Sequence, residues 1–107
     1  MSSARARKRF GQHFLKSAEV IDKIIDVVAP QERQTIVEVG PGRGALTGPL
    51  LEAGAQVIGV EMERDAAAYL SRTFGRIAGF RLVNEDFLRF DPGNCGLTRF
   101  VLVGNLP

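Results

Sequence analysis

The sequence predicts an α/β fold built on a parallel sheet. Short apolar segments alternate along the 107 residues with segments whose apolar residues recur at helical spacing. The apolar segments are apolar on both faces, as in a sheet that helices cover. A Gly-rich turn follows the first of them, as in nucleotide-binding α/β folds. Right-handed crossovers then predict the strand order 3-2-1-4 of a Rossmann-like sheet.

The first predicted helix begins after Ser17, which is a favourable N-cap residue. It ends before Pro30, which cannot continue a helix. Its apolar residues recur at helical spacing: Val20, Ile21, Ile24, Val27 and Val28.

The first predicted strand is Thr35–Val39. A second helix is predicted from near Gly44 to Ala53, with Gly54 as its C-terminal stop. Pro49 fits the first turn of this helix if Thr47 is the N-cap.

Three further strands and one helix are predicted in the second half of the chain. The strands are 57–60, which ends at Glu61, then 80–83, and 100–103. The last of these is an almost uninterrupted apolar segment. The helix lies between the second and third strands and is defined by Ala66, Ala67, Leu70 and Phe74.

Composition and cysteine content indicate a soluble protein of the cytoplasm. The chain is 45% hydrophobic and 24% charged, as in ordinary globular domains. No apolar segment approaches the length that spans a membrane, and no signal peptide is recognisable. Cys95 is the only cysteine and is predicted to lie in a loop; one cysteine and one histidine do not make a metal site.

The positive charge is concentrated at the N-terminus. Four basic residues precede residue 10 and leave 10 basic and 12 acidic residues in the rest of the chain. A basic arm on a nearly neutral body favours contact with a polyanion such as RNA, although a solvated tail has the same composition. We therefore divide the chain into residues 1–16, an arm that also caps the ligand site, and residues 17–107, the sheet domain. The four basic residues before residue 10 are Arg5, Arg7, Lys8 and Arg9.

The turn after the first strand predicts a binding site for a nucleoside. Gly40, Gly42 and Gly44 give the spacing G-x-G-x-G, whereas the dinucleotide motif is G-x-G-x-x-G. Glu38, immediately before the turn, would repel a pyrophosphate and suits a cationic ligand. S-adenosylmethionine carries an ammonium and a sulfonium and no phosphate, so it fits this corner better than a dinucleotide does.

The other strands end in polar residues at the same predicted edge of the sheet. Glu61 lies about 20 residues beyond the glycines, where a carboxylate can hold both ribose hydroxyls. Asp86 can accept a hydrogen bond from an adenine amino group, and Asn105 follows the fourth strand. Because the carboxyl ends of parallel strands line ligand sites, these residues are predicted to converge.

The last four residues, Gly104-Asn105-Leu106-Pro107, suggest recognition of an amine. Asn105 offers an amide oxygen, and Pro107 favours an extended Leu106 whose carbonyl can point outward. Two adjacent acceptors suit an exocyclic amine, which has two N–H bonds.

Three motifs in this order resemble the ribosomal RNA adenine dimethyltransferases, and in particular the members that act on the small subunit. They are Arg7–Leu15 (RKRFGQHFL), Glu38–Thr47 (EVGPGRGALT) and Asn105–Pro107 (NLP). The resemblance implies a methyltransferase fold, N6,N6-dimethylation of adenines in 16S rRNA during ribosome biogenesis, and no membrane partner. It also implies that S-adenosylmethionine contacts His13, Leu15, Gly40, Glu61, Asp86 and Asn105. Together with Glu38 and with Gly42 of the glycine turn, these residues make up the predicted cofactor site.

The resemblance assigns catalysis to Asn105, Leu106 and Pro107, and RNA contact to the basic arm. Position 13 is often asparagine in the family, so His13 departs from the pattern. The family continues after the last motif with an aromatic residue, further strands and a helical C-terminal domain. We therefore expect an N-terminal fragment that is catalytically incomplete and self-associates through the exposed edge of its fourth strand.

Three alternatives remain open on the sequence. One is the large-subunit rRNA methyltransferase of macrolide resistance. Another is an NAD-binding oxidoreductase domain, which Glu38 and the Asn-Leu-Pro motif disfavour. The third is a non-catalytic rRNA-binding assembly factor that retains the pocket.

Overall fold

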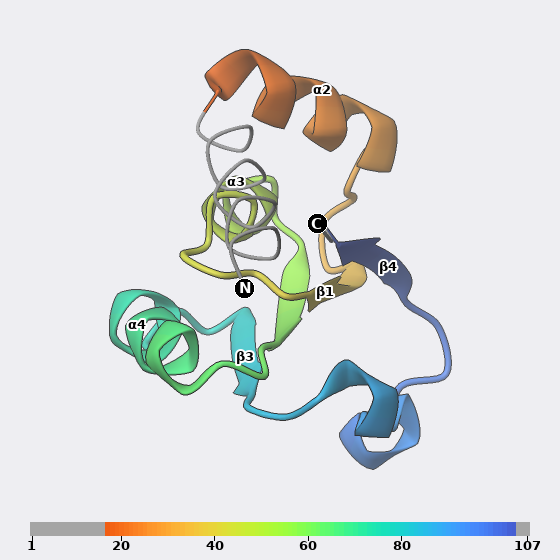
Figure 1. Cartoon of the computed structure of the whole chain (residues 1–107). Helices are drawn as coiled ribbons and strands as arrows, with labels where there is room; N and C mark the ends of the chain where they lie inside the picture. Colours follow the sequence, from red (N-terminus) through yellow and green to blue (C-terminus); the bar gives the residue numbers. More distant parts are fainter. Residues whose placement is uncertain (1–16, 105–107) are drawn as a thin grey trace.

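The computed structural model describes residues 17–104, which form a four-stranded parallel sheet with helices packed on one face (Figure 1). The order is β3-β2-β1-β4, and all three neighbouring pairs are parallel. This arrangement confirms the predicted α/β class and the order 3-2-1-4. The strands are β1 Thr35–Val39, β2 Gln56–Val60, β3 Phe80–Val83 and β4 Val101–Gly104.

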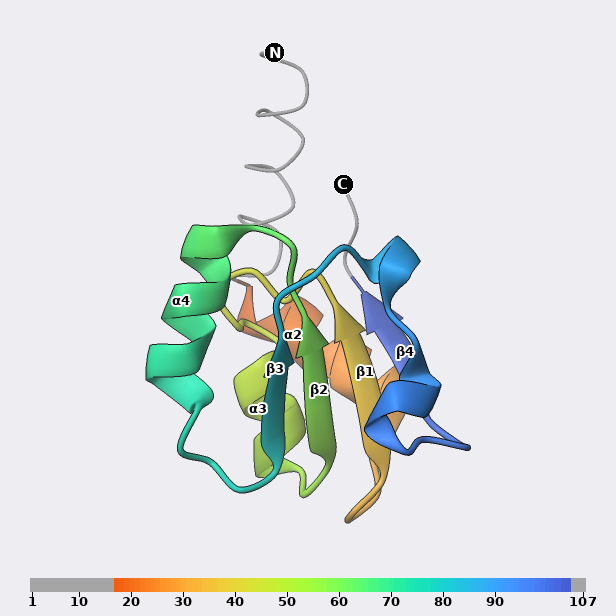
Figure 2. The same cartoon turned by 90° about the horizontal axis from the view of Figure 1, so that it is seen from below.

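Three helices cover the same face of the sheet: α2 Ala18–Val28, α3 Thr47–Glu52 and α4 Arg64–Phe74 (Figure 2). Ser17 caps α2 as predicted, because its side chain accepts a hydrogen bond from the Val20 N–H at 3.4 Å. The predicted apolar residues of α4 are also confirmed, since Ala67 and Leu70 are buried.

Two predictions about the helices were wrong. Val27 was placed in the apolar stripe of α2, but its side chain is 84% exposed. The second helix begins at Thr47 rather than near Gly44, because the preceding residues form the glycine turn. Its N-cap is Leu46, so the Thr47 hydroxyl is free for another partner. Pro49 lies in the first turn, where its missing N–H removes no helical hydrogen bond.

The segment between β3 and β4 differs from the sequence prediction. It contains two short 3-10 helices, η1 Phe87–Arg89 and η2 Pro92–Cys95, where no helix was predicted and Cys95 was expected in a loop. Asp86 and Asp91 begin these turns by accepting backbone N–H bonds. The predicted fourth strand is also shifted by one residue, since Val101 is the first residue that pairs with β1.

The sheet separates two apolar clusters. The larger cluster lies under the three helices and includes Ile36, Leu50, Val57 and Leu70. The smaller cluster lies on the opposite face and consists of Val37 of β1 with Ile58 and Val60 of β2. Residues of the 87–97 segment pack against it: Phe87, Phe90, Cys95 and Leu97. Both faces of β1 are therefore buried, as a central parallel strand requires.

No helix within residues 17–104 is both long enough and apolar enough to cross a bilayer.

Candidate functional site

The turn between β1 and α3 has three residues in the left-handed backbone region. Gly40, Gly42 and Gly44 have φ values of 64°, 59° and 84°. Only glycine adopts such angles without steric cost, which explains the G-x-G-x-G spacing. The Gly40 N–H donates to the Val60 carbonyl at 2.9 Å, so the turn is held at the carboxyl ends of β1 and β2.

The three glycines differ in what surrounds them. A Cβ atom at Gly40 or Gly42 would meet nothing within 4 Å, whereas one at Gly44 would collide with the Phe74 ring of α4. Gly44 therefore allows α4 to pack against the turn. Gly40 and Gly42 leave open space beside the backbone, as a turn that a ligand contacts must do.

Glu38 lies beneath this turn and is 3% exposed. The Thr47 hydroxyl donates to its Oε1 at 2.6 Å. Burial raises the pKa of Glu38 from 4.5 to about 7; the Thr47 hydrogen bond acts in the opposite direction, and the charge of Glu61 adds to the increase. Glu38 therefore changes its charge near neutral pH.

Glu61, directly after β2, lies against the glycine turn as the sequence predicted. Its Oε1 accepts from the Gly42 N–H at 2.9 Å, and its Oε2 accepts from the Glu63 N–H at 2.9 Å. The side chain thus connects the turn after β1 with the start of α4, whose N-cap is Glu63. The two acids of the predicted site, Glu38 and Glu61, are brought together at one edge of the sheet.

Asn84 and Thr47 are two residues of the site that sequence reasoning missed. The Asn84 amide donates to the Glu61 carbonyl at 2.8 Å, so it holds the backbone after β2 in place. Its position directly after β3 was a usable signal, because polar residues at strand ends meet at one edge. Thr47 was interpreted as an N-cap, and nothing in its sequence position indicated the contact with Glu38.

Asp86 follows β3 at the same edge and is half-buried. Its Oδ1 accepts from the Leu88 N–H at 3.0 Å, which begins η1. The predicted contact with an adenine amino group remains a prediction.

The other predicted site residues lie outside residues 17–104. Gly104, the last described residue, pairs with Val39, so β4 ends beside β1. The remaining predictions therefore stay predictions: the cofactor contacts His13 and Leu15, the basic residues Arg5, Arg7, Lys8 and Arg9, and the motif Asn105, Leu106 and Pro107.

The two buried acids at this edge, Glu38 and Glu61, favour a cation over a phosphate. Within residues 17–104, the only ion pair joins Lys23 to Glu19 on α2. Neither Glu38 nor Glu61 therefore forms an ion pair with a described basic residue. Residues 17–104 also contain no group of three or more His, Cys, Asp or Glu that could hold a metal ion. Two adjacent carboxylates beside an open glycine turn suit an organic cation with hydroxyl groups.

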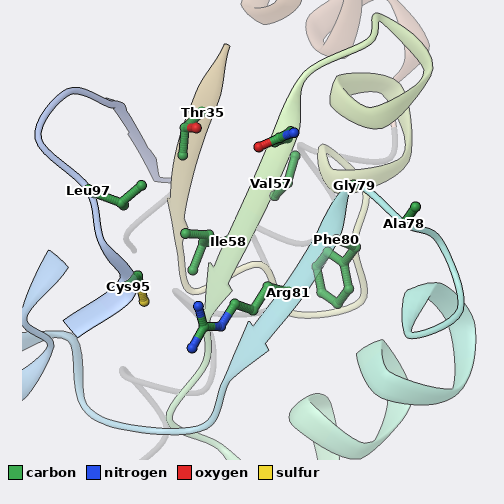
Figure 3. Close-up of a pocket in the computed structure, with 10 residues that line it drawn as sticks. Thr35, Val57, Ile58, Ala78, Gly79, Phe80, Arg81, Cys95 and Leu97 are labelled. Atoms are coloured by element: carbon green, nitrogen blue, oxygen red, sulfur yellow. The ribbon is translucent and has the colours of Figure 1, made fainter. Parts of the chain in front are cut away.

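A hollow of about 210 Å³ lies at the opposite ends of the strands (Figure 3). Its walls include the first residues of three strands, Thr35, Gln56 and Phe80, together with Cys95 and Leu97. Because ligands of open α/β sheets bind at the carboxyl ends of the strands, this hollow is separate from the glycine-turn site.

Comparison with known proteins decides the family. The model of the family described as ribosomal RNA adenine dimethylase matches residues 3–107. The chain belongs to the ribosomal RNA adenine dimethylase family.

Curated relatives of this dimethylase-family chain carry the name ribosomal RNA small subunit methyltransferase A. The protein of Pseudomonas savastanoi pv. phaseolicola is 46% identical over 105 residues, which cover 96% of this chain and 39% of the relative. That of Thermosynechococcus vestitus is 44% identical over 103 residues, which cover 96% and 38%. The chain thus spans about two fifths of the length of these relatives.

Solved structures agree with the fold of this dimethylase-family chain. The 23S rRNA methyltransferase ErmE superposes with a TM-score of 0.76 and 29% identity, covering 88% of this chain and 37% of that one. A dimethyladenosine transferase from Plasmodium falciparum gives 0.71 and 21%, covering 85% and 32%. These likenesses confirm the Rossmann-like methyltransferase fold.

Proposed function

We propose that this chain forms the cofactor-binding part of an enzyme that transfers methyl groups from S-adenosylmethionine to the N6 atoms of adenines in small-subunit rRNA. The observation that carries the proposal is the open glycine turn with Glu38 and Glu61 beside it, in a chain that is 46% identical to a small-subunit methyltransferase. We place this activity in the cytoplasm, where ribosomal precursors are its partners.

The residues of the glycine turn fit S-adenosylmethionine. Gly40 and Gly42 leave room for the ligand along the backbone, and Glu38 supplies negative charge for its ammonium group. Glu61 would hold the ribose hydroxyls. Both of its oxygens already accept one backbone N–H, and each retains a lone pair for a hydroxyl. Asp86, His13, Leu15 and Asn105 complete the proposed set.

Bound S-adenosylmethionine would supply a methyl group on a sulfonium, and transfer of the methyl group would leave a neutral thioether. The protein would therefore need to position the adenine amine, and the methylated amine would shed its proton to water afterwards, so no strong base is required. We assign positioning to the Asn105 amide oxygen and the Leu106 carbonyl, with Pro107 fixing the backbone. The target adenine must leave its stack to reach them.

The chain alone is proposed to bind cofactor without completing methyl transfer. Support comes from its coverage of only 38–39% of the first two curated relatives. We also propose that residues 1–16 contact rRNA phosphates, that residues 17–107 are the N-terminal part of the methyltransferase domain, and that copies of the chain associate through β4.

Calorimetric titration with S-adenosylmethionine and with NAD tests the cofactor assignment. We expect binding of the first and none of the second. Binding of NAD alone would replace the proposal with the oxidoreductase alternative.

Methyl transfer is tested with a chimera that joins this chain to the remaining residues of the Pseudomonas relative. Radiolabelled S-adenosylmethionine is supplied with small-subunit or large-subunit rRNA. We expect label on small-subunit adenines, none with Asn105→Ala and none with the 107-residue chain alone. Label on large-subunit rRNA only would favour the ErmE-like alternative. A folded chimera that binds small-subunit rRNA and transfers nothing would favour the assembly-factor alternative.

A further inference from the structure

Thr47 is buried beneath the glycine turn and donates its hydroxyl hydrogen to a carboxylate rather than to the backbone. Its side chain is 0% exposed, and the distance from its Oγ1 to Glu38 Oε1 is 2.6 Å. A hydroxyl–carboxylate bond of this length belongs to the strong, charge-assisted class. Among residues 17–104, no other group donates to the Glu38 carboxylate.

This bond closes the base of the glycine turn. Glu38 is the fourth residue of β1, and Thr47 is the first residue of α3, so the two ends of the segment that contains all three glycines are joined side chain to side chain. A movement of α3 relative to β1 would therefore break this bond or displace the Glu38 carboxyl group under the turn.

The same bond favours the ionised form of Glu38 against two opposing effects. Burial and the nearby charge of Glu61, at the end of β2, both favour the protonated form. The neighbouring strand β4, Val101–Gly104, has no titratable side chain, and the one acid of α3, Glu52, lies at its far end. Thr47 is the group in the described structure that stabilises the negative charge.

We propose that Thr47 is a positioning residue of the cofactor site, which holds the Glu38 carboxyl group beneath the glycine turn and favours its ionised form, so that a cationic ligand meets negative charge there. This inference rests on the proposed binding of S-adenosylmethionine. Thr47 itself need not touch the ligand, since it acts through Glu38.

The matched variants are Thr47→Val, which keeps the shape and removes the hydroxyl, and Thr47→Ser, which keeps the hydroxyl. The first measurement uses the ligand-free chain. The Glu38 carboxyl carbon, assigned by its loss in Glu38→Gln, is titrated by NMR. We expect the pKa of Glu38 to rise above its wild-type value in Thr47→Val and to match it in Thr47→Ser. Should Thr47→Val fail to fold, Thr47→Ala takes its place.

The second measurement is calorimetric titration with S-adenosylmethionine across neutral pH. Wild-type affinity should rise with pH as Glu38 ionises. Thr47→Val should bind about tenfold more weakly near neutral pH, because a hydrogen bond to a charged group is lost, and should recover part of this at higher pH. Thr47→Ser should follow the wild-type profile.

Two results would overturn the inference. One is an unchanged pKa of Glu38 in folded Thr47→Val or Thr47→Ala, and the other is a loss of affinity that is equal at every pH, as a purely structural role predicts. If the wild-type chain binds no S-adenosylmethionine at any pH, the proposed function fails instead. A higher pKa of Glu38 in Thr47→Val than in the wild type and Thr47→Ser would then still establish that Thr47 controls the charge of Glu38.

Discussion

The two acids at the glycine turn have different surroundings. Within residues 17–104, the Glu38 carboxylate accepts one hydrogen bond, from a hydroxyl, while the Glu61 carboxylate accepts two, from backbone N–H groups. Both side chains are nearly buried. Substitution of each acid should therefore change a different property of the molecule.

Replacement of Glu38 by Gln should change how stability depends on pH. The unfolded chain releases this proton near pH 4.5 and the folded chain near pH 7, so the folded state holds more protons between these values. The free energy of unfolding therefore falls as pH rises through this interval, by about 3 kcal/mol in total. In Glu38→Gln this contribution should vanish. Urea unfolding from about pH 4 to about pH 8 measures it.

The control for this measurement is Glu85→Gln, which removes an exposed acid at the same edge of the sheet. Its pH dependence should follow that of the wild type. Parallel curves for the wild type and Glu38→Gln would show that Glu38 does not hold its proton up to neutral pH.

Replacement of Glu61 by Ala should weaken S-adenosylmethionine binding well over tenfold. Charge-assisted bonds contribute about 1.5–3 kcal/mol each and are not additive, and the Gly42 and Glu63 N–H groups also lose their acceptor. Calorimetry on the folded variant gives the Kd, with Glu85→Gln again as the control for lost charge. An unchanged Kd would remove Glu61 from the site.

The glycine turn contains one glycine that serves packing and two that leave open space. Gly42→Ala should cost about 1–2 kcal/mol, because its φ is positive. Gly44→Ala should cost about 1–3 kcal/mol more than Gly42→Ala, since its Cβ also collides with the Phe74 ring. Denaturant unfolding gives both values. In a double mutant, Phe74→Leu should recover part of the loss at Gly44; if it recovers nothing, the collision is not the cause.

The basic arm is expected to contact RNA phosphates rather than the cofactor. Each phosphate contact releases counterions, so replacing Arg5, Arg7, Lys8 and Arg9 by Ala should flatten the salt dependence of RNA binding. Affinity for S-adenosylmethionine should barely change. If RNA binding by the four-alanine variant depends on salt as strongly as binding by the wild type, the arm does not contact the phosphates.

Sequence patterns predicted the elements whose signals are local. Thr35–Val39 and Phe80–Val83 match β1 and β3, because short apolar segments that alternate with helical patterns are typical of parallel strands. The start of α3 was wrong because the glycine turn extends to Leu46 before the helix begins. The Thr47–Glu38 bond could not be predicted, since it depends on how α3 packs against β1.

At the scale of the whole molecule, the order of the strands creates the site. The chain crosses from β1 to β2 and β3 on one side and then returns to place β4 on the other side of β1. The strand order therefore reverses between β1 and β4, and ligands of open α/β sheets bind at the carboxyl ends of the strands at such a position. This topology was predictable, because right-handed crossovers leave few alternatives.

The same topology leaves β4 at an edge of the described sheet. Among residues 17–104, β4 pairs only with β1, and Leu102 on it is 53% exposed. Unpaired edges with apolar side chains recruit other strands, and two copies related by a twofold axis would join identical edges in antiparallel fashion. We therefore expect the 107-residue chain to self-associate, with a sedimentation coefficient that rises with concentration.

Leu102→Lys should shift this association toward the monomer, because a lysine on an edge strand opposes edge pairing. The matched control is Val27→Lys, which places the same charge on an equally apolar position of α2 that is 84% exposed. Sedimentation velocity over a range of concentrations compares the three proteins. If Val27→Lys dissociates the chain as effectively as Leu102→Lys, general surface charge rather than the β4 edge controls association. A wild-type chain that stays monomeric at high concentration would show that this edge does not recruit a second copy.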